Sequence, residues 1–235
     1  MKKVIWSLFL FTAITLLCVE CYAQSTTREK RNESGFTGVS FGLAGNLYIK
    51  TGSGYDVTLE GNPNYLEDVE TIVRDGRLII RHERNFRFNF NNERINVYIT
   101  MPEVESLSIS GSGKAKVENS LRSDRMNLSV SGSGRIDIPS LTANELKCSI
   151  SGSGDIIISG GKIGKAGLSI SGSGSYDGED AEIEEFDAGI SGSGNCTCHV
   201  TESLSASISG SGNVIYSGSP RINVRASGSG RVRSR

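Results

Sequence analysis

Apolar and polar residues alternate with a period of two through most of the second half of the chain. In the stretch "LSVSGSGRIDI", from Leu128 to Ile138, apolar residues lie three and one positions before the tetrapeptide Ser-Gly-Ser-Gly and two and four positions after it. Strict alternation of this kind predicts half-buried β-strands. We therefore expect an all-β region in which each tetrapeptide is flanked by strand residues.

The tetrapeptide occurs seven times, at intervals of 21, 20, 20, 20, 18 and 18 residues, beginning at positions 110, 131, 151, 171, 191, 209 and 227. A fixed period of this length marks units that bury their apolar side only by stacking on their neighbours. The intervals are too short for a strand, a crossover helix and a return, but they suit one coil of a parallel β-helix. The pattern predicts a single-chain parallel β-helix, or solenoid, of right-handed coils of 18–21 residues.

In such a solenoid, equivalent residues of successive coils lie about 4.8 Å apart and form columns along the axis. Two columns should face inward. The first holds Leu107, Leu128, Cys148, Leu168, Ala188, Ala206 and Val224, and the second holds Ile109, Val130, Ile150, Ile170, Ile190, Ile208 and Ala226. The same alternation turns the serines of the tetrapeptide outward and its glycines inward, so each copy predicts a sharp corner with almost no interior side chain.

Residues 36–104 lack the tetrapeptide and carry a less regular pattern. The run from Phe36 to Gly61 indicates two or three strands, and Asp75-Gly76 indicates a turn before another strand. We expect this part to form an N-terminal head that covers the first coil of the seven repeats at 105–235. Together the two parts form one β-helix domain over residues 36–235.

The first residues have the composition of a secretory signal peptide, with two lysines, an apolar run and a small residue at Ala23. We expect cleavage after residue 23 and a flexible linker over residues 24–35. A transmembrane anchor and a lipoprotein acylated at Cys18 or Cys21 are the less favoured alternatives. No later segment is long and apolar enough to span a bilayer, so the mature chain should lack a transmembrane segment.

Charge and cysteine content limit the classes of function that the chain can have. The net charge of −1 does not indicate a basic surface that would bind nucleic acid.

Cys148, Cys196 and Cys198 remain after removal of the leader, and this odd number predicts no disulfide framework. Alternation places Cys196 and Cys198 inward, where cysteines pack as small hydrophobic residues. Only Asp155 is an acidic residue directly after a tetrapeptide, so the repeats form no calcium ladder, and we expect no metal ion and no cofactor.

The chain also resembles the family called putative auto-transporter adhesin, head GIN domain. The resemblance rests on "FTGV" (36–39), "GNLYI" (45–49), "VTLEG" (57–61), "DGRLII" (75–80) and the repeated Ser-Gly-Ser-Gly strands. It covers nearly all of the mature chain. It implies an exported β-helical protein, common in Bacteroidetes-like bacteria, without an established catalytic site.

Three functions follow as hypotheses. The first is a non-enzymatic, exported binding or adhesion module of the cell envelope, in the periplasm, at the outer membrane or secreted. Its polar faces would meet a glycan or a cell-surface protein, or a second copy of the chain. The second is a pectinase-like enzyme that uses Asp137, Asp155 and Asp177, which should face outward on three successive coils at separations of roughly 8 Å. The third is a structural envelope protein. We expect no catalytic, cofactor-binding or metal-binding residues under the first.

Overall fold

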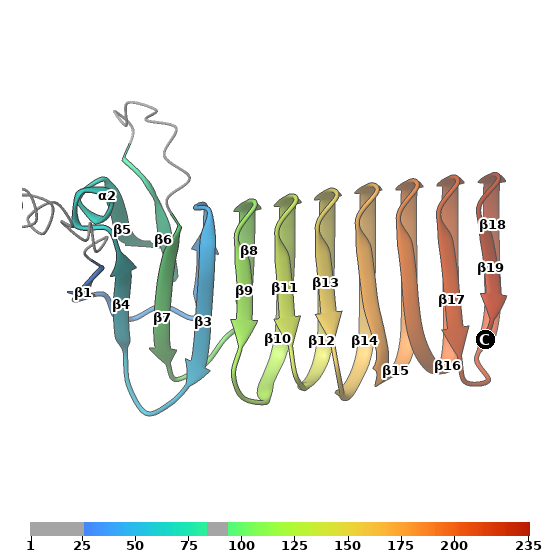
Figure 1. Ribbon diagram of the computed structural model, residues 1–235. Helices are drawn as coiled ribbons and strands as arrows, with labels where there is room; N and C mark the ends of the chain where they lie inside the picture. The colour runs from blue at the N-terminus through green and yellow to red at the C-terminus, as the bar shows by residue number, and fades with distance from the viewer. Residues whose placement is uncertain (1–25, 84–93) are drawn as a thin grey trace, which may run out of the picture.

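The computed structural model describes residues 26–83 and 94–235. Nearly all of these residues lie in strands of one sheet, which winds into a row of stacked coils (Figure 1). The predicted parallel β-solenoid is therefore confirmed, while its right-handed winding stays a prediction. The expected signal peptide, residues 1–23, lies outside the described residues. Within the described ranges, no helix is both long and apolar enough to cross a membrane.

Each repeat consists of a strand that leads into the Ser-Gly-Ser-Gly turn and a strand that leaves it. The strands of the repeats are β8 (Ser106–Gly111), β9 (Lys114–Val117), β10 (Leu121–Gly132), β11 (Arg135–Ile138), β12 (Leu141–Gly152), β13 (Asp155–Ile158), β14 (Gly161–Gly172), β15 (Ser175–Gly192), β16 (Asn195–Gly210), β17 (Asn213–Ser217), β18 (Arg221–Gly228) and β19 (Arg231–Ser234). They pair in parallel with the equivalent strands of the next coil. Leu128, for example, pairs with Leu107 on one side and Cys148 on the other.

The shortening of the repeat from 20 to 18 residues is absorbed at two neighbouring irregularities, between Gly178 and Glu182 and between Ile183 and Glu185. Gly178 of β15 pairs with Cys198 of β16, but the next pair joins Glu182 to His199. The residues between Gly178 and Glu182 therefore have no counterpart in the following coil. Part of the acidic run "DGEDAEIEEFD" thus forms an irregular corner, and the flanking columns stay in register.

The two predicted inward columns form the centre of the core. Their members pair coil by coil, and all except the last of each column are buried. Burying a Val, Leu or Ile side chain contributes about 1.5–3 kcal/mol relative to leaving it exposed. Because each buried member packs against its equivalents in both neighbouring coils, a coil depends on the stack for its stability.

The Ser-Gly-Ser-Gly turns require glycine at both positions, for two different reasons. In the fourth copy Gly172 has φ +124°, and a Cβ there would lie 2.4 Å from the carbonyl oxygen of Gly152. A Cβ on Gly174 would lie 2.4 Å from the carbonyl oxygen of Gly154 and 2.5 Å from Cγ2 of Ile150. The amide of Ser173 donates to the carbonyl oxygen of Gly152 at 2.8 Å, so the turn is itself part of the ladder. The prediction of a side-chain-free corner is confirmed.

The head contains the remaining strands and the one helix of the described residues. These elements are β1 (Thr27–Arg31), β2 (Gly38–Phe41), β3 (Gly45–Thr51), β4 (Asp56–Gly61), α2 (Pro63–Glu67), β5 (Val69–Arg74), β6 (Arg77–His82) and β7 (Ile95–Met101). Strands β2 and β3 stack directly on β8 and β9, and β6 and β7 stack on the other side of β2 and β3. The coil of β6 and β7 therefore lies outside the coil of β2 and β3, although it comes later in the chain.

Antiparallel strands close the N-terminal end of the stack. Strand β4 pairs with β7, β1 pairs with β4, and β5 pairs with β6 (Figure 1). Leu66 of α2 and Val69 of β5 are buried beneath this cap. The expected covering of the first coil is confirmed, but the expected flexible linker over 24–35 is wrong for Thr27–Arg31. These residues form β1, because the polar strand pairs along its whole length with β4.

Candidate functional site

A groove runs along the solenoid over the strands that lead into the Ser-Gly-Ser-Gly turns. We call it the axial groove. One part has a volume of about 470 Å³ and is lined by residues 145–147, 165–167, 185–187, 203–205 and 221–223. A second part of about 340 Å³ lies beside Glu105, residues 125–127, Glu145 and Lys147. The groove therefore follows three neighbouring columns across six coils, a length of roughly 24 Å at the usual strand spacing.

The first wall of the axial groove carries charges of alternating sign. Successive residues of this column are Arg125, Glu145, Lys165, Glu185, Ser203 and Arg221. Lys165 Nζ lies 3.1 Å from Glu185 Oε2. Each charge except Arg221, which follows Ser203, thus has an opposite charge one coil away, so the wall presents hydrogen-bond donors and acceptors in turn and little net charge.

The second wall of the axial groove has shorter side chains and fewer charges. Its column consists of Asn127, Lys147, Gly167, Asp187, Ser205 and Asn223. Lys147 Nζ reaches across to Glu145 Oε1 at 2.9 Å, and this hydrogen bond lowers the pKa of Glu145. At Gly167 an added Cβ would find no atom within 4 Å. The middle of the groove is therefore open on this side.

Apolar residues form the floor. They are Met126, Leu146, Ala166, Phe186, Leu204 and Ile222, of which all but Ile222 are buried. The wide part of the groove is lined mainly by apolar surface, whereas the part near Glu105 is mainly polar. The five buried side chains point into the core, because the residues on either side of each face outward, so a ligand in the groove would meet mainly the side chains of the two walls.

The three candidate catalytic aspartates lie on a different face, on the strands that leave the turns. Asp155 stands in a column between Arg135 and Ser175, and Asp137 and Asp177 stand in the next column on either side of Ile157. Arg135 Nε donates to Asp137 at 2.8 Å, and Arg135 NH1 lies 3.6 Å from Asp155. Asp155 also accepts a hydrogen bond from Ser175. The predicted outward placement is confirmed, and Arg135 neutralises part of the cluster.

The three cysteines are buried and free of disulfide bonds. Cys196 pairs with Tyr176 and Val214, and Cys198 pairs with Gly178 and Tyr216, and both face inward as the sequence predicts. Burial raises the pKa of the Cys148 thiol, and burial followed by the hydrogen bond with Cys198 raises the pKa of Cys196. In the two described ranges, no group of three or more His, Cys, Asp or Glu side chains is placed to hold a metal ion.

These thiols should be inert in the folded protein. We expect the native chain to react with a thiol-specific disulfide reagent at least about a thousandfold more slowly than the chain in denaturant, because reaction requires opening of the core. Absorbance of the released thiol measures both rates. Fast labelling of any thiol under native conditions would contradict this placement.

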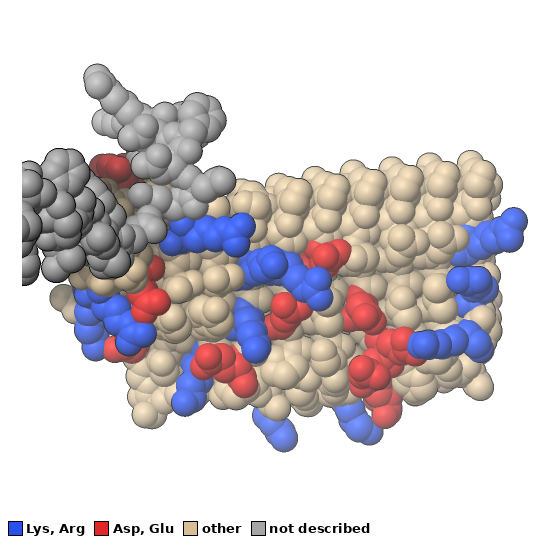
Figure 2. Space-filling view, viewed as in Figure 1, with Lys and Arg blue, Asp and Glu red and all other residues tan. Residues whose placement is uncertain are grey.

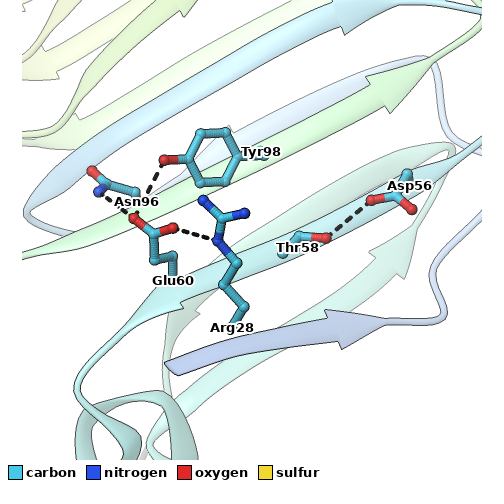
Figure 3. A network of polar contacts seen from close by, with 6 residues as sticks. All are labelled: Arg28, Asp56, Thr58, Glu60, Asn96 and Tyr98. Atoms are coloured by element: carbon cyan, nitrogen blue, oxygen red, sulfur yellow. Dashed lines mark hydrogen bonds and ion pairs between the residues drawn. The ribbon is translucent and has the colours of Figure 1, made fainter. Parts of the chain in front are cut away.

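A polar network on the head fixes the antiparallel cap (Figure 3). Arg28 of β1 donates to Glu60 of β4 at 2.6 Å, and Asn96 of β7 donates to the other oxygen of that carboxylate at 3.1 Å. The Arg28 guanidinium lies 5.6 Å from the ring centroid of Tyr98, which stacks on Tyr48 at 5.1 Å. The network joins β1, β4, β7 and β3, which explains why a polar strand is ordered at the end of the fold.

The network should make the cap sensitive to acid. The hydrogen bond from Asn96, followed by that from Arg28, lowers the pKa of Glu60. Because the pKa of Glu60 is lower in the folded state, the stabilisation by its carboxylate is fully present above the unfolded-state pKa of about 4.3. This stabilisation is lost as the pH falls through the folded-state pKa. We expect Glu60→Gln to weaken the hydrogen-exchange protection of β1 at neutral pH. Below about pH 4, the further loss of that protection should be smaller in the variant than in the wild type. A variant with the wild-type pH dependence would contradict this role.

Sequence reasoning missed the axial groove, although one signal for it was available. When the repeats are aligned, Arg125, Glu145, Lys165 and Glu185 fall in one column with alternating charge. The alternation indicates a surface along which opposite charges pair between coils. It does not indicate that this surface is concave, which depends on how the long strands bend.

The comparisons place the chain among proteins of the same architecture. Residues 35–220 match the model of the family described as "Putative auto-transporter adhesin, head GIN domain". The chain is 26% identical to a protein of Bacteroides fragilis NCTC 9343 described as a putative adhesin, with a TM-score of 0.84 over 90% of this chain and 98% of that one. No curated protein matches the chain.

Two further crystal structures show the same fold at lower identity. A protein of Parabacteroides merdae ATCC 43184, described as a putative adhesin, is 22% identical with a TM-score of 0.72 over 90% of this chain and 97% of that one. A protein of Parabacteroides distasonis ATCC 8503, described as a putative lipid binding protein, is 18% identical with a TM-score of 0.68 over the same shares.

Proposed function

Because this chain belongs to the family described as putative auto-transporter adhesin, head GIN domain, we propose that it is an exported, non-enzymatic binding module whose axial groove holds an extended partner chain. The groove is the observation that carries the proposal. Its two parts share Glu145 and Lys147, follow the same columns across six coils and present walls of hydrogen-bond donors and acceptors. Export follows from the expected removal of residues 1–23.

The chemistry of the walls favours a neutral glycan. The four basic residues Arg125, Lys147, Lys165 and Arg221 are balanced by the four acidic residues Glu105, Glu145, Glu185 and Asp187, so a strongly charged polymer would gain little. A sugar hydroxyl both donates and accepts, and it can therefore bridge a carboxylate on one coil and an ammonium group on the next.

A pair of glycine substitutions tests the groove. Gly167→Trp places a large side chain in the open part of the groove, where its Cβ meets no atom within 4 Å. Gly189→Trp is the matched control, because its Cβ would lie 3.7 Å from the carbonyl oxygen of Leu168, an ordinary contact, in a column outside the groove. On a glycan array we expect Gly167→Trp to lower binding at least about tenfold and Gly189→Trp to retain it. Equal binding by both variants would exclude the groove.

The enzymatic alternative uses Asp137, Asp155 and Asp177 and is tested on the same glycans. A product-release assay distinguishes it, because an adhesion module binds without forming new reducing ends. Product release that disappears in Asp155→Asn would favour the pectinase-like enzyme over the binding module. An array without any signal would favour a protein partner or a structural role in the envelope.

The edge formed by the Ser-Gly-Ser-Gly turns is a less suitable binding surface. Figure 2 shows that this edge carries no Lys, Arg, Asp or Glu side chain, whereas charges of both signs are spread over the adjoining face. Its glycines are required by the backbone, and its serines are exposed. Architecture therefore accounts for the repeated motif, and the partner is assigned to the groove instead.

A further inference from the structure

The two ends of the solenoid differ in how their apolar residues are covered. At the N-terminal end the antiparallel cap buries Leu66, Val69 and Leu78 to 2% exposure or less. At the other end Ile222 and Val224 of β18 are 48% and 42% exposed, although Leu204 and Ala206, their partners one coil back, are 1% and 2% exposed. The last coil therefore presents core positions of the repeat to solvent.

The same end presents two edge strands. Strand β18 pairs with β16 and β19 pairs with β17, and within the described ranges no strand continues the sheet beyond them (Figure 1). An edge strand offers a row of backbone N–H and C=O groups to an incoming strand. In this solenoid the incoming strand would take the position of one more coil.

The charge of this end selects the kind of strand that can pair with it. Residues 203–235 contain five arginines and no acidic residue. Arg221 and Arg225 on β18 and Arg231 and Arg233 on β19 are exposed on the strands themselves. Arg235 pairs with Glu179 of an earlier coil. Acidic side chains on an added strand would face these arginines, and its alternate residues would cover Ile222 and Val224.

A second copy of the chain is a poor occupant. Pairing two such ends would bring the arginines of one copy against those of the other, and like charges opposite each other destabilise a strand pair. The capped end offers no complementary charge, because the carboxylates beside β1 already pair with its cations, Arg28 with Glu60, Lys30 with Asp56 and Arg31 with Glu29. The basic edge thus disfavours both end-to-end arrangements of this protein.

We propose that the β18–β19 edge is a docking site for an acidic, extended segment of a partner protein, which adds to the sheet as a further strand. The segment alternates acidic and apolar residues, so that its carboxylates meet Arg221 and Arg225 while its apolar side chains cover Ile222 and Val224. This site shares Arg221 and Ile222 with the last coil of the axial groove, but it rests on the exposed edge of β18, and its peptide test needs no glycan.

The charge part of the proposal is tested with a labelled peptide that repeats Glu-Val-Ser-Val. We expect fluorescence anisotropy to show binding to the purified protein and no binding of the matched peptide that repeats Lys-Val-Ser-Val. The double variant Arg221→Glu, Arg225→Glu should lose affinity for the acidic peptide at least about tenfold. The control Arg77→Glu, Arg122→Glu makes the same charge change at exposed residues of β6 and β10 and should retain it.

Strand addition is tested with two versions of the acidic peptide, which we call its two phases. One is N-methylated on the odd-numbered residues and the other on the even-numbered residues. Only the phase whose methyl groups point away from β18 should bind, because the other blocks the backbone hydrogen bonds. Equal binding of both phases would overturn strand addition. No binding of the acidic peptide, equal binding of the basic peptide, or a dimer that is lost in the Arg221→Glu, Arg225→Glu variant would overturn the proposed partner.

Discussion

Replacement of Gly172 by alanine should lower the free energy of unfolding by about 3 kcal/mol or more. The backbone there has φ +124°, and holding an L-residue in such a conformation costs about 1–3 kcal/mol. The added Cβ also lies 2.4 Å from the carbonyl oxygen of Gly152, which cannot move away because it accepts hydrogen bonds from Ser173 and Gly174. Overpacking of this kind costs about a further 1–3 kcal/mol. Urea unfolding followed by far-ultraviolet circular dichroism measures the change.

Gly167→Ala is the matched control for this substitution. Gly167 lies in the same strand, β14, and its Cβ would meet no atom within 4 Å. Alanine at such a site is neutral or stabilises by about 0.4–1 kcal/mol, because it restricts the unfolded chain. If both variants lost the same stability, the turn would not depend on its backbone conformation, and the explanation of the repeated motif would fail.

Replacement of Phe186 by alanine should cost about 3–5 kcal/mol. The Phe186 side chain is 3% exposed, and its ring centroid lies 5.7 Å from that of Tyr176. Its partner in the preceding coil is Ala166, which is too small to fill the space that the phenyl ring would leave. The cavity therefore persists in the variant. Urea unfolding again reports the loss, and hydrogen exchange should locate it in β14, β15 and β16.

The control for this cavity is Ile222→Ala in the same column. Ile222 is 48% exposed, so its truncation removes fewer packing contacts and leaves no enclosed space. We expect it to cost less than about 1.5 kcal/mol. A loss as large as that of Phe186→Ala would mean that the last coil is covered in solution, which would also contradict the open edge at β18.

The repeats could be predicted from the sequence because the alternation and the period act together. Alternation fixes which side chains of a strand face inward, and the period fixes which residues of successive coils are neighbours. Ile150 was therefore placed correctly beside Val130 and Ile170, and Cys196 was placed correctly in the core. No energetic detail was needed, since seven copies of one motif allow a single packing arrangement.

The head could not be predicted in the same way, because its coils do not stack in the order of the chain. Strands β6 and β7 lie outside β2 and β3, so the chain reverses direction along the axis after β4. Only the long-range pairing of Asn46 with Asn96 and of Tyr48 with Tyr98 shows this arrangement. Strand β1 was missed because its polar residues give no apolar alternation, and its order comes from Arg28 and Glu60.

The candidate site was the least predictable part. The sequence correctly placed Asp137, Asp155 and Asp177 on the surface, but it could not show that Arg135 pairs with two of them. In β12 the alternation of buried and exposed residues breaks beside Glu145 without a glycine or proline, although the equivalent part of β14 contains Gly164 and Gly167, so the sequence gives no consistent signal for the groove. Concave surfaces of this kind arise from the stack and not from any one repeat.

The most direct test of the account is a hydrogen–deuterium exchange map of the protein with the glycan that gives the strongest array signal. We predict added protection at residues 145–147, 165–167, 185–187 and 203–205, along the axial groove, and no change at the Ser-Gly-Ser-Gly turns. Protection at the turns, or at Asp137, Asp155 and Asp177 without change in the groove, would contradict the assignment of binding to the axial groove.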